Sequence, residues 1–295
     1  MTHYKIRHTT AYQYSEPVAL SQNQLRLTPR NRGGQRLLRR RLRISPKPEM
    51  ITHRRDYFAN LVSHFDVYEP HGELVITSHA EVDVNRPLIE LKMPSPSWDS
   101  VVHQLKTDIT GNGLHRYQFS FPSALAPKLP IAYDYAVRSF PKGRPILAAA
   151  FELIERIHKD FVYDPTATTV TTTVPEVFQK KRGVCQDLAH VALSCFRSLG
   201  LAASYVSGYV RTYSDENQAE LVGADASHAW VSLFAGSLGW IDFDPTNKLI
   251  VQNEHVVLAI GRDYRDVCPV NGLFIGGGQQ TLSVSVRLKP DVATT

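Results

Sequence analysis

A cysteine at the start of a predicted helix is the residue of this chain best placed for nucleophilic chemistry. Cys185 follows Gly183, which permits a tight turn, and precedes apolar residues that recur at three- and four-residue steps as far as Leu199. Gly200 then ends the pattern. The spacing predicts a largely buried helix whose first turn holds Cys185. At that position, unpaired backbone N–H groups and the positive end of the helix dipole favour a thiolate.

The helix alone is a weak activator, so the thiol requires a basic partner. Lowering the pKa of a thiol from about 8.5 to below neutrality takes about 2 kcal/mol, whereas a helix terminus supplies about 0.3–1 kcal/mol. Histidine is a common partner for such a thiol, and His228 opens an alternating run over residues 228–234. A Gly/Ser turn separates this run from a second one at 240–244. The pattern predicts a β-hairpin that carries the base.

Two aspartates on the second run could orient the imidazole. A hairpin centred on Gly236 sets Asp244 directly opposite His228, where cross-strand Cβ atoms are about 4.5–5.5 Å apart. It sets Asp242 opposite Trp230, as a solvated or secondary hydrogen-bond acceptor. We therefore predict Asp244 as the acid that holds the ring in one tautomer. A slip in the register would change this assignment.

Three ordered motifs give the chain a resemblance to a known family. Residues 183–190 (GVCQDLAH), 227–231 (SHAWV) and 240–247 (WIDFDPTN) resemble the bacterial transglutaminase-like proteins, whose core belongs to the papain-like cysteine-enzyme superfamily. The resemblance implies that Cys185 is the nucleophile, His228 the base and Asp244 the acid. It covers residues 146–250, and roughly the first 85 residues resemble the β-rich region that accompanies this core in bacteria.

Composition limits the compartment and the cofactors that we expect. The 295-residue chain has three cysteines, which do not suggest a disulfide framework. Its N-terminus shows no apolar signal region, and no apolar run approaches the roughly 18 residues of a membrane span. No zinc spacing, calcium loop or phosphate-binding motif stands out, so we expect neither a metal nor a cofactor. We expect a reducing, cytoplasmic setting without membrane association.

Basic residues are concentrated near the N-terminus. Residues 1–48 contain 11 Lys and Arg against one acid, Glu16, and most of them lie at 26–43. The cluster could bind a polyanion or form the solvated edge of a sheet. Apolar residues alternate with arginines over 38–44, and no aromatic residues are interleaved for base stacking. We favour the solvated strand and expect no specific nucleic-acid binding.

The supporting elements predict an α+β protein. Alternating runs at 3–14, 37–44, 60–68 and 74–84 predict an N-terminal antiparallel β-sandwich. This precedes a papain-like, transglutaminase-like core in which the cysteine helix packs on an antiparallel sheet. We divide the chain as follows: a β-rich domain at 1–90, a connecting segment at 91–145, a catalytic core at 146–250, and C-terminal strands at 251–295 that can rejoin the first domain. A polar loop at 211–224 could border the substrate.

Other chemistry-bearing residues have simpler explanations. Cys195 lies on the apolar face of the helix, and His190 points about 140° away from Cys185, so both are assigned to the packing. The helix dipole alone explains Asp187. Gln179 and Gln186 could each donate to an oxyanion, although the backbone N–H of Cys185 is the safer assignment.

These observations favour a cysteine-dependent enzyme that acts on the amide bonds of a protein or peptide through an acyl-thioester. Release by water would give hydrolysis, and release by an amine would give transglutamination. The resemblance to bacterial relatives, without a calcium site, favours hydrolysis. The alternative of another class is a basic, β-rich binding module with a vestigial core.

Overall fold

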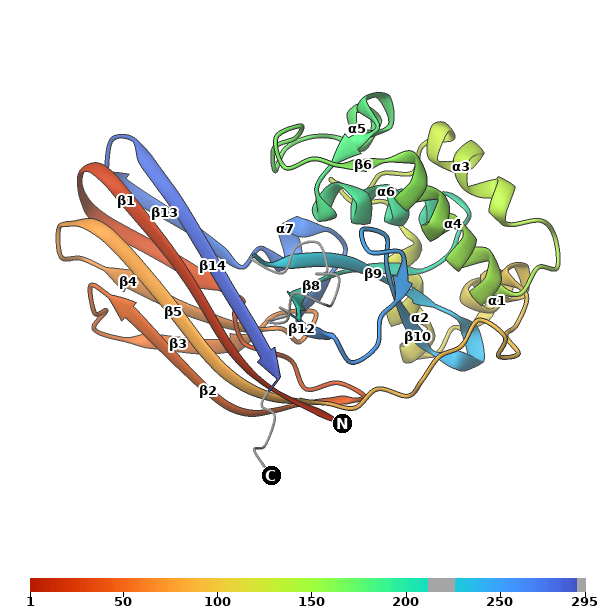
Figure 1. Ribbon diagram of the computed structural model, residues 1–295, viewed down its shortest axis with the longest axis horizontal. Helices are drawn as coiled ribbons and strands as arrows, with labels where there is room; N and C mark the ends of the chain where they lie inside the picture. The colour runs from red at the N-terminus through yellow and green to blue at the C-terminus, as the bar shows by residue number, and fades with distance from the viewer. Residues whose placement is uncertain (212–225, 291–295) are drawn as a thin grey trace, which may run out of the picture.

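Two lobes lie side by side in the computed structural model, which describes residues 1–211 and 226–290 (Figure 1). An all-β lobe contains both ends of the described chain, and a mixed lobe contains the cysteine helix. Most of the predicted polar loop at 211–224 lies outside the described residues. The α+β fold class, with antiparallel sheets in both lobes, is confirmed.

One long strand organises the all-β lobe. The first half of β1 (Thr2–Leu25) pairs with β5 (His71–Val84) and β14 (Gln280–Pro290), and its second half pairs with β4 (Leu61–Val67) and β13 (Val270–Gly276). The register shifts between Gln13 and Val18, where the strand bends. The sheet thereby curves around an apolar core that includes Phe65 and Ile76. The remaining strands of this sheet are β2 (Gln35–Ser45), which pairs with β5, and β3 (Ile51–Arg55), which pairs with β4.

The C-terminal part of the chain contributes to both lobes. β13 and β14 pair with β1 and therefore belong to the all-β lobe. β12 (His255–Gly261) instead pairs with β8 in the sheet of the mixed lobe. The sheet of the mixed lobe thus extends beyond residue 250, where the sequence-based boundary fell.

The mixed lobe is a sheet packed against helices. Its order is β11-β10-β9-β8-β12, with antiparallel pairing throughout. The strands are β8 (Ala203–Val210), β9 (His228–Phe234), β10 (Trp240–Asp244), β11 (Leu249–Ile250) and β12. One sheet face, with Val231 and Phe243, shares a core with α6 (Cys185–Ser198), α4 (Ile146–Asp160), α5 (Val174–Lys180) and α3 (Pro130–Ala136). Residues 186–197 of α6 are all buried, as the apolar pattern predicted.

A shared core joins the two lobes. Tyr4, Ile6 and Val82 of the all-β lobe pack against Tyr209 and Val256 of the mixed lobe, and all of them are buried. Because these residues alternate along their strands, one face of the β1–β5 pair contacts the mixed lobe and the other faces solvent.

The connecting segment is more regular than its proline content suggested. It forms α1 (Trp98–Thr107) and α2 (Gly111–Tyr117), followed by the 3₁₀ turn η1 (Gln118–Ser120). Side chains at the N-caps, Ser97 and Thr110, accept hydrogen bonds from the first turns. These helices are short, so their periodicity is weak in the sequence, and their stability comes from packing onto the mixed lobe.

Candidate active site

The entry to α6 is held by a buried carboxylate. Asp187 Oδ2 accepts hydrogen bonds from the Val184 N–H at 2.8 Å and from Thr168 Oγ1 at 2.6 Å. Burial raises the pKa of Asp187, and these two hydrogen bonds oppose the rise. A Cβ at Gly183 would lie 2.6 Å from the same carboxylate, so glycine is required there. Asp187 is thus a helix cap that fixes the turn before Cys185, and the helix dipole alone does not explain it.

The two helix cysteines lie in different environments. Cys185 is the first residue of α6 and is partly exposed, whereas Cys195 is buried. Burial raises the pKa of Cys195 well above its ordinary value. Of the two helix thiols, Cys185 is therefore the one that solvent reaches.

His228, the first residue of β9, lies between Cys185 and Asp244. Its Nε2 is 2.8 Å from Asp244 Oδ2, and both side chains are fully buried. Burial by itself lowers the pKa of His228, but the Asp244 carboxylate and the Cys185 thiolate together raise it to about 10. With Nε2 directed to the carboxylate, Nδ1 remains for the thiol. This nitrogen makes no hydrogen bond within the described residues, so it is unoccupied.

The Asp244 carboxylate is saturated with donors. Oδ1 accepts the backbone N–H groups of Thr246 at 2.9 Å and Asn247 at 3.1 Å. Oδ2 accepts from Asn247 Nδ2 at 2.8 Å and lies 3.0 Å from His255 Nε2, in addition to His228. Burial raises the pKa of Asp244, but the charge and hydrogen bonds of the two histidines outweigh it and hold the pKa well below its ordinary range.

The hairpin register differs from the predicted one. Asp242 pairs with Ser232 and Trp240 with Phe234, so the hairpin is centred one residue later than Gly236. The cause is a longer loop: the Ala235 N–H bonds to the Gly239 carbonyl around a 3₁₀ turn, η3 (Gly236–Leu238). Asp244 therefore reaches His228 diagonally, a distance that long side chains span in an antiparallel pair.

Asp242 is neither solvated nor next to the base. Its carboxylate accepts from Ser232 Oγ and, at 3.3 Å, from Trp230 Nε1. Arg32 of the all-β lobe binds both carboxylate oxygens, at 2.9 and 3.2 Å. Of the two expectations for Asp242, the structure shows the hydrogen-bond acceptor. The solvated carboxylate was wrong, because Arg32, 210 positions away in the sequence, binds it through a tertiary contact.

His255 is the residue that the sequence reasoning missed. It lies on β12, fully buried, with its Nε2 on the Asp244 carboxylate and its ring 5.0 Å from that of Trp230. Burial lowers the pKa of His255, and the carboxylate opposes this effect. A lone histidine at the start of an apolar strand was the only local signal, and nothing in it pointed to Asp244.

His228, Asp244 and His255 also have the composition of a metal-ligand set. Their ligand atoms lie within 4.8 Å of one another. The hydrogen-bond distances from both Nε2 atoms to one carboxylate oxygen account for this closeness. All three side chains are buried and hydrogen-bonded to one another, so the arrangement is explained without an ion, and the expectation that no metal is required stays a prediction.

The other sequence candidates lie elsewhere. His190 is buried and its Nε2 accepts the Tyr264 N–H at 3.2 Å, which satisfies it as a core histidine. Gln186 donates its amide to the Val170 carbonyl at 3.3 Å, and Gln179 is exposed. The structure therefore gives neither glutamine a contact with the thiol.

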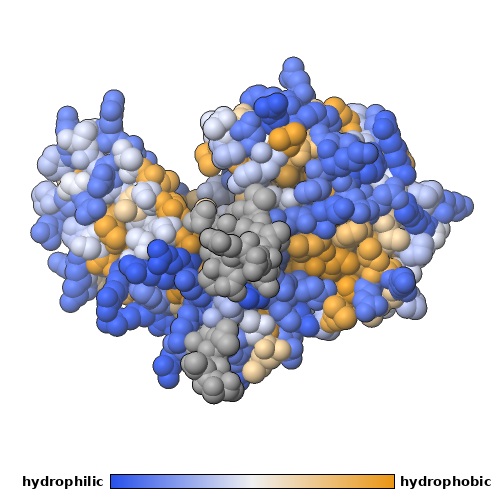
Figure 2. All heavy atoms as spheres, in the orientation of Figure 1, coloured by the Kyte–Doolittle hydropathy of each residue, from blue (hydrophilic) through white to orange (hydrophobic). Residues whose placement is uncertain are grey.

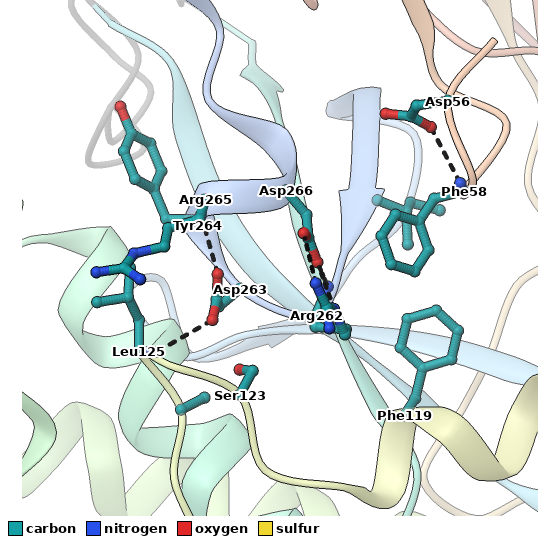
Figure 3. Close-up of polar contacts among 12 residues, drawn as sticks. Asp56, Phe58, Phe119, Ser123, Leu125, Arg262, Asp263, Tyr264, Arg265 and Asp266 are labelled. Carbon is teal, nitrogen blue, oxygen red and sulfur yellow. Dashed lines mark hydrogen bonds and ion pairs between the residues drawn. The ribbon is translucent and has the colours of Figure 1, made fainter. Parts of the chain in front are cut away.

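Three tyrosines interact electrostatically with Cys185. Burial raises the pKa values of Tyr163, Tyr205 and Tyr264, and Cys185 adds to the rise in each; for Tyr264 the effect of Cys268 is larger than that of Cys185. Tyr264 opens the short helix α7 (Tyr264–Val267). That helix is anchored by Asp263, whose carboxylate accepts from the Leu125 and Arg265 N–H groups, both at 3.0 Å (Figure 3).

The fold and this cluster define the papain-like class of cysteine enzymes, with a thiol at a helix start and a histidine and a carboxylate on an adjacent sheet. Residues 4–83 match the bacterial transglutaminase-like N-terminal region, and residues 135–245 match the transglutaminase-like superfamily. The chain belongs to this family of bacterial transglutaminase-like proteins, and the resemblance in its sequence motifs is confirmed.

Related proteins cover nearly the whole chain. An uncharacterised protein of Mycobacterium tuberculosis H37Rv is 36% identical over 97% of this chain and 92% of its own length. An uncharacterised protein of Mycobacterium leprae is 29% identical over 96% of this chain and 97% of its own length. A solved structure from Cytophaga hutchinsonii, provisionally described as a cysteine protease, superposes with a TM-score of 0.80 at 21% identity, covering 100% of this chain and 92% of that one.

In the parts of the chain that the structure describes, none of the helices combines the length and the hydrophobicity needed to cross a bilayer.

Proposed function

We propose that the protein is a cysteine-dependent enzyme that acts on amide bonds of a protein or peptide, with Cys185 as nucleophile, His228 as base and Asp244 as orienting acid. The observation that supports this most is the position of His228. It is fully buried, bound through Nε2 to Asp244, and close enough to Cys185 for the thiolate to raise its pKa. A reducing compartment, which we take to be the cytoplasm, keeps such a thiol usable.

The proposed reaction follows from this order of groups. His228 Nδ1 takes the thiol proton, the sulfur attacks the amide carbonyl, and a tetrahedral oxyanion forms. As the C–N bond breaks, the leaving amine takes the proton from the imidazolium, and an acyl-thioester remains on Cys185. Water, deprotonated by His228, then attacks the thioester and releases a carboxylic acid. An amine in place of water would give acyl transfer, and we favour hydrolysis.

The first test is the reactivity of the thiol. With iodoacetamide near pH 6, we expect stoichiometric alkylation of Cys185, located by peptide mass mapping. We expect none at that position in Cys185→Ser, and an unchanged rate in the control Cys195→Ser. In a library of peptide p-nitroanilides, Cys185→Ser should lose all turnover while keeping its fold, and Cys195→Ser should keep its chemistry. A dead Cys195→Ser together with a fully active Cys185→Ser would show that the nucleophile is misassigned.

The second test separates hydrolysis from acyl transfer. Turnover of the same library with and without added cadaverine, analysed by product mass, reports the acceptor. Free acids as the main products in the presence of the amine would support a hydrolase. Cadaverine adducts as the main products would identify an acyltransferase.

The binding-module alternative is supported by one observation, the cationic outer face of the all-β lobe. Arg41, Arg7 and Arg287 occupy one cross-strand row of that face, and all three are exposed. An inert Cys185 thiol would favour this alternative, and a reactive thiol would favour the enzyme.

A further inference from the structure

A pocket between the two lobes lies apart from the cysteine. It has a volume of about 500 Å³ and lacks Cys185, His228 and Asp244 from its walls. The turn after β1 and the segment after β5 form one side, and the sheet of the mixed lobe and η1 form the other. Its volume is in the range of small-molecule sites.

The walls of this pocket carry excess positive charge. Arg30, Arg32 and Arg86 line it, and Asp242 is the one acidic residue among its described lining residues. Arg32 already binds both oxygens of that aspartate. Burial, together with the charge of Arg32, lowers the pKa values of Arg30 and Arg86 to about 10 each, although the nearby aspartates offset part of this effect. A buried charge without a counterion is costly, so the pocket favours an anion.

Arg86, which lines the pocket, has one buried edge of its guanidinium group without a hydrogen-bond partner within the described residues. Its Nη1 donates to the Gln252 carbonyl at 2.7 Å, and its backbone N–H donates to Asn253 Oδ1 at 2.9 Å, which fixes the residue in place. Nε and Nη2 are buried and have no hydrogen-bond partner within residues 1–211 and 226–290. These two nitrogens share the edge that binds a carboxylate through two parallel N–H···O bonds. Buried donors normally find a partner, so this edge calls for an acceptor.

The rest of the wall is apolar. Phe119, Trp240 and Ile89 line the pocket together with further aliphatic side chains. Figure 2 shows hydrophobic surface on this side of the mixed lobe, over β10 and α2. A small inorganic anion would leave these side chains without contacts, whereas an acid with an aromatic or aliphatic body would cover them.

We propose that this pocket binds an organic carboxylate with an apolar body, that the Arg86 side chain shifts so that its unpaired edge, closed to solvent in this structure, receives the carboxylate, and that Trp240 and Phe119 contact the body. The ligand is either a free small acid or the C-terminal end of a peptide, because both present the same chemistry. The site is independent of the reaction proposed for Cys185, so a Cys185→Ser variant retains it.

Calorimetry and tryptophan fluorescence test this proposal on the whole protein, because Trp240 lies in the pocket wall. With 3-phenylpropionate we expect saturable binding, and with 3-phenylpropionamide at least about tenfold weaker binding, since the bidentate charged hydrogen bonds are lost. Arg86→Gln should weaken binding of the acid by about tenfold or more. Arg86→Lys keeps the charge but lacks the paired N–H donors of the guanidinium group, so its affinity should lie between those of the wild type and Arg86→Gln. The matched control is Arg36→Gln on the exposed outer face, with no effect expected.

Two further comparisons identify where the carboxylate ligand comes from and whether the pocket prefers a carboxylate to phosphate. Acetyl-Ala-Ala-Phe with a free carboxylate, compared with its amide, tests the peptide end: tighter binding than 3-phenylpropionate identifies a peptide C-terminus, and weaker binding identifies a free acid. Equal affinity for acid and amide, or an unaffected Arg86→Lys variant, would overturn the proposal. Tighter binding of inorganic phosphate than of every carboxylate would overturn it as well. If Arg86→Gln does not fold, as judged by circular dichroism, the Arg86→Lys comparison decides.

Discussion

At the residue scale, the proposed acid and its neighbour have separate structural roles. Asp244 binds the imidazole of His228 directly, whereas Asp242 binds Arg32, Trp230 and Ser232. The two carboxylates are two residues apart on one strand face, so only the contacts of their side chains distinguish them.

This difference predicts unequal kinetic effects of two conservative changes. Asp244→Asn should lower kcat/KM by about 10–10³, less than the roughly 10⁴ found in serine triads, because a thiolate–imidazolium pair is already charged. Asp242→Asn should lower kcat/KM by less than about tenfold, worth about 1.4 kcal/mol, and should instead reduce stability by weakening the pair with Arg32. Steady-state kinetics and thermal unfolding of both variants check this. A larger kinetic loss for Asp242→Asn would mean that the acid is misassigned.

A second residue-scale prediction concerns His255 as a positioning residue. Its Nε2 is one of three side-chain donors around Asp244 Oδ2, and removing it should raise the pKa of the carboxylate and so lower that of His228. His255→Ala should lower kcat by about tenfold and move the alkaline limb of the kcat/KM profile to lower pH. The control His255→Gln retains a donor and should recover part of both effects. An alkaline limb at its original pH in His255→Ala would refute this role.

At the element scale, β2 lies within a cationic sheet face. Arg41 of β2, His79 of β5, Arg7 of β1 and Arg287 of β14 lie in one cross-strand row. Burial and the surrounding arginines lower the pKa of His79, a sign of the local positive potential. The arginines on this face are exposed, as expected for a solvated strand.

We predict that this face does not bind nucleic acid tightly. Arg39 Nε lies 3.8 Å from Glu81 Oε2, and this carboxylate offsets part of the positive charge. The alternating pattern also places no aromatic side chain among the arginines for base stacking. We expect no sub-micromolar binding of duplex DNA at physiological salt, measured by fluorescence anisotropy. Sub-micromolar binding that is lost in Arg39→Glu with Arg41→Glu would contradict this expectation.

At the scale of the whole molecule, the buried histidine links folding to pH. The pKa of His228 is raised from 6.5 to about 10 in the folded protein, so folding favours its protonated form. This stabilisation is complete below about pH 6.5, the unfolded value, and is lost as the pH rises through about 10. The free energy of unfolding should therefore decline over this range, and His228→Gln should show a smaller decline. Denaturant unfolding from pH 6 to 10 measures both, and equal slopes in the two proteins would contradict the assignment.

The sequence by itself determined the parts of the site that depend on local patterns. The apolar period with its glycine boundaries predicted α6 with Cys185 at its start, and alternation around a Gly/Ser turn predicted the hairpin of His228 and Asp244. It also indicated the strands of the all-β lobe, because period-2 alternation is a property of neighbouring residues. The helices α1 and α2 of the connecting segment were not predicted, since their few apolar positions give no clear period.

Tertiary structure alone decided how distant segments meet. A 3₁₀ turn set the hairpin register, and β12 brought His255 to Asp244 from outside the predicted core. Arg32 of the all-β lobe binds Asp242 of the mixed lobe, 210 positions away in the sequence. The C-terminal strands pair with β1. No local pattern encodes such contacts, because they follow from the joint packing of many side chains. Those same contacts form the pocket around Arg86 and complete the donor shell of the proposed acid.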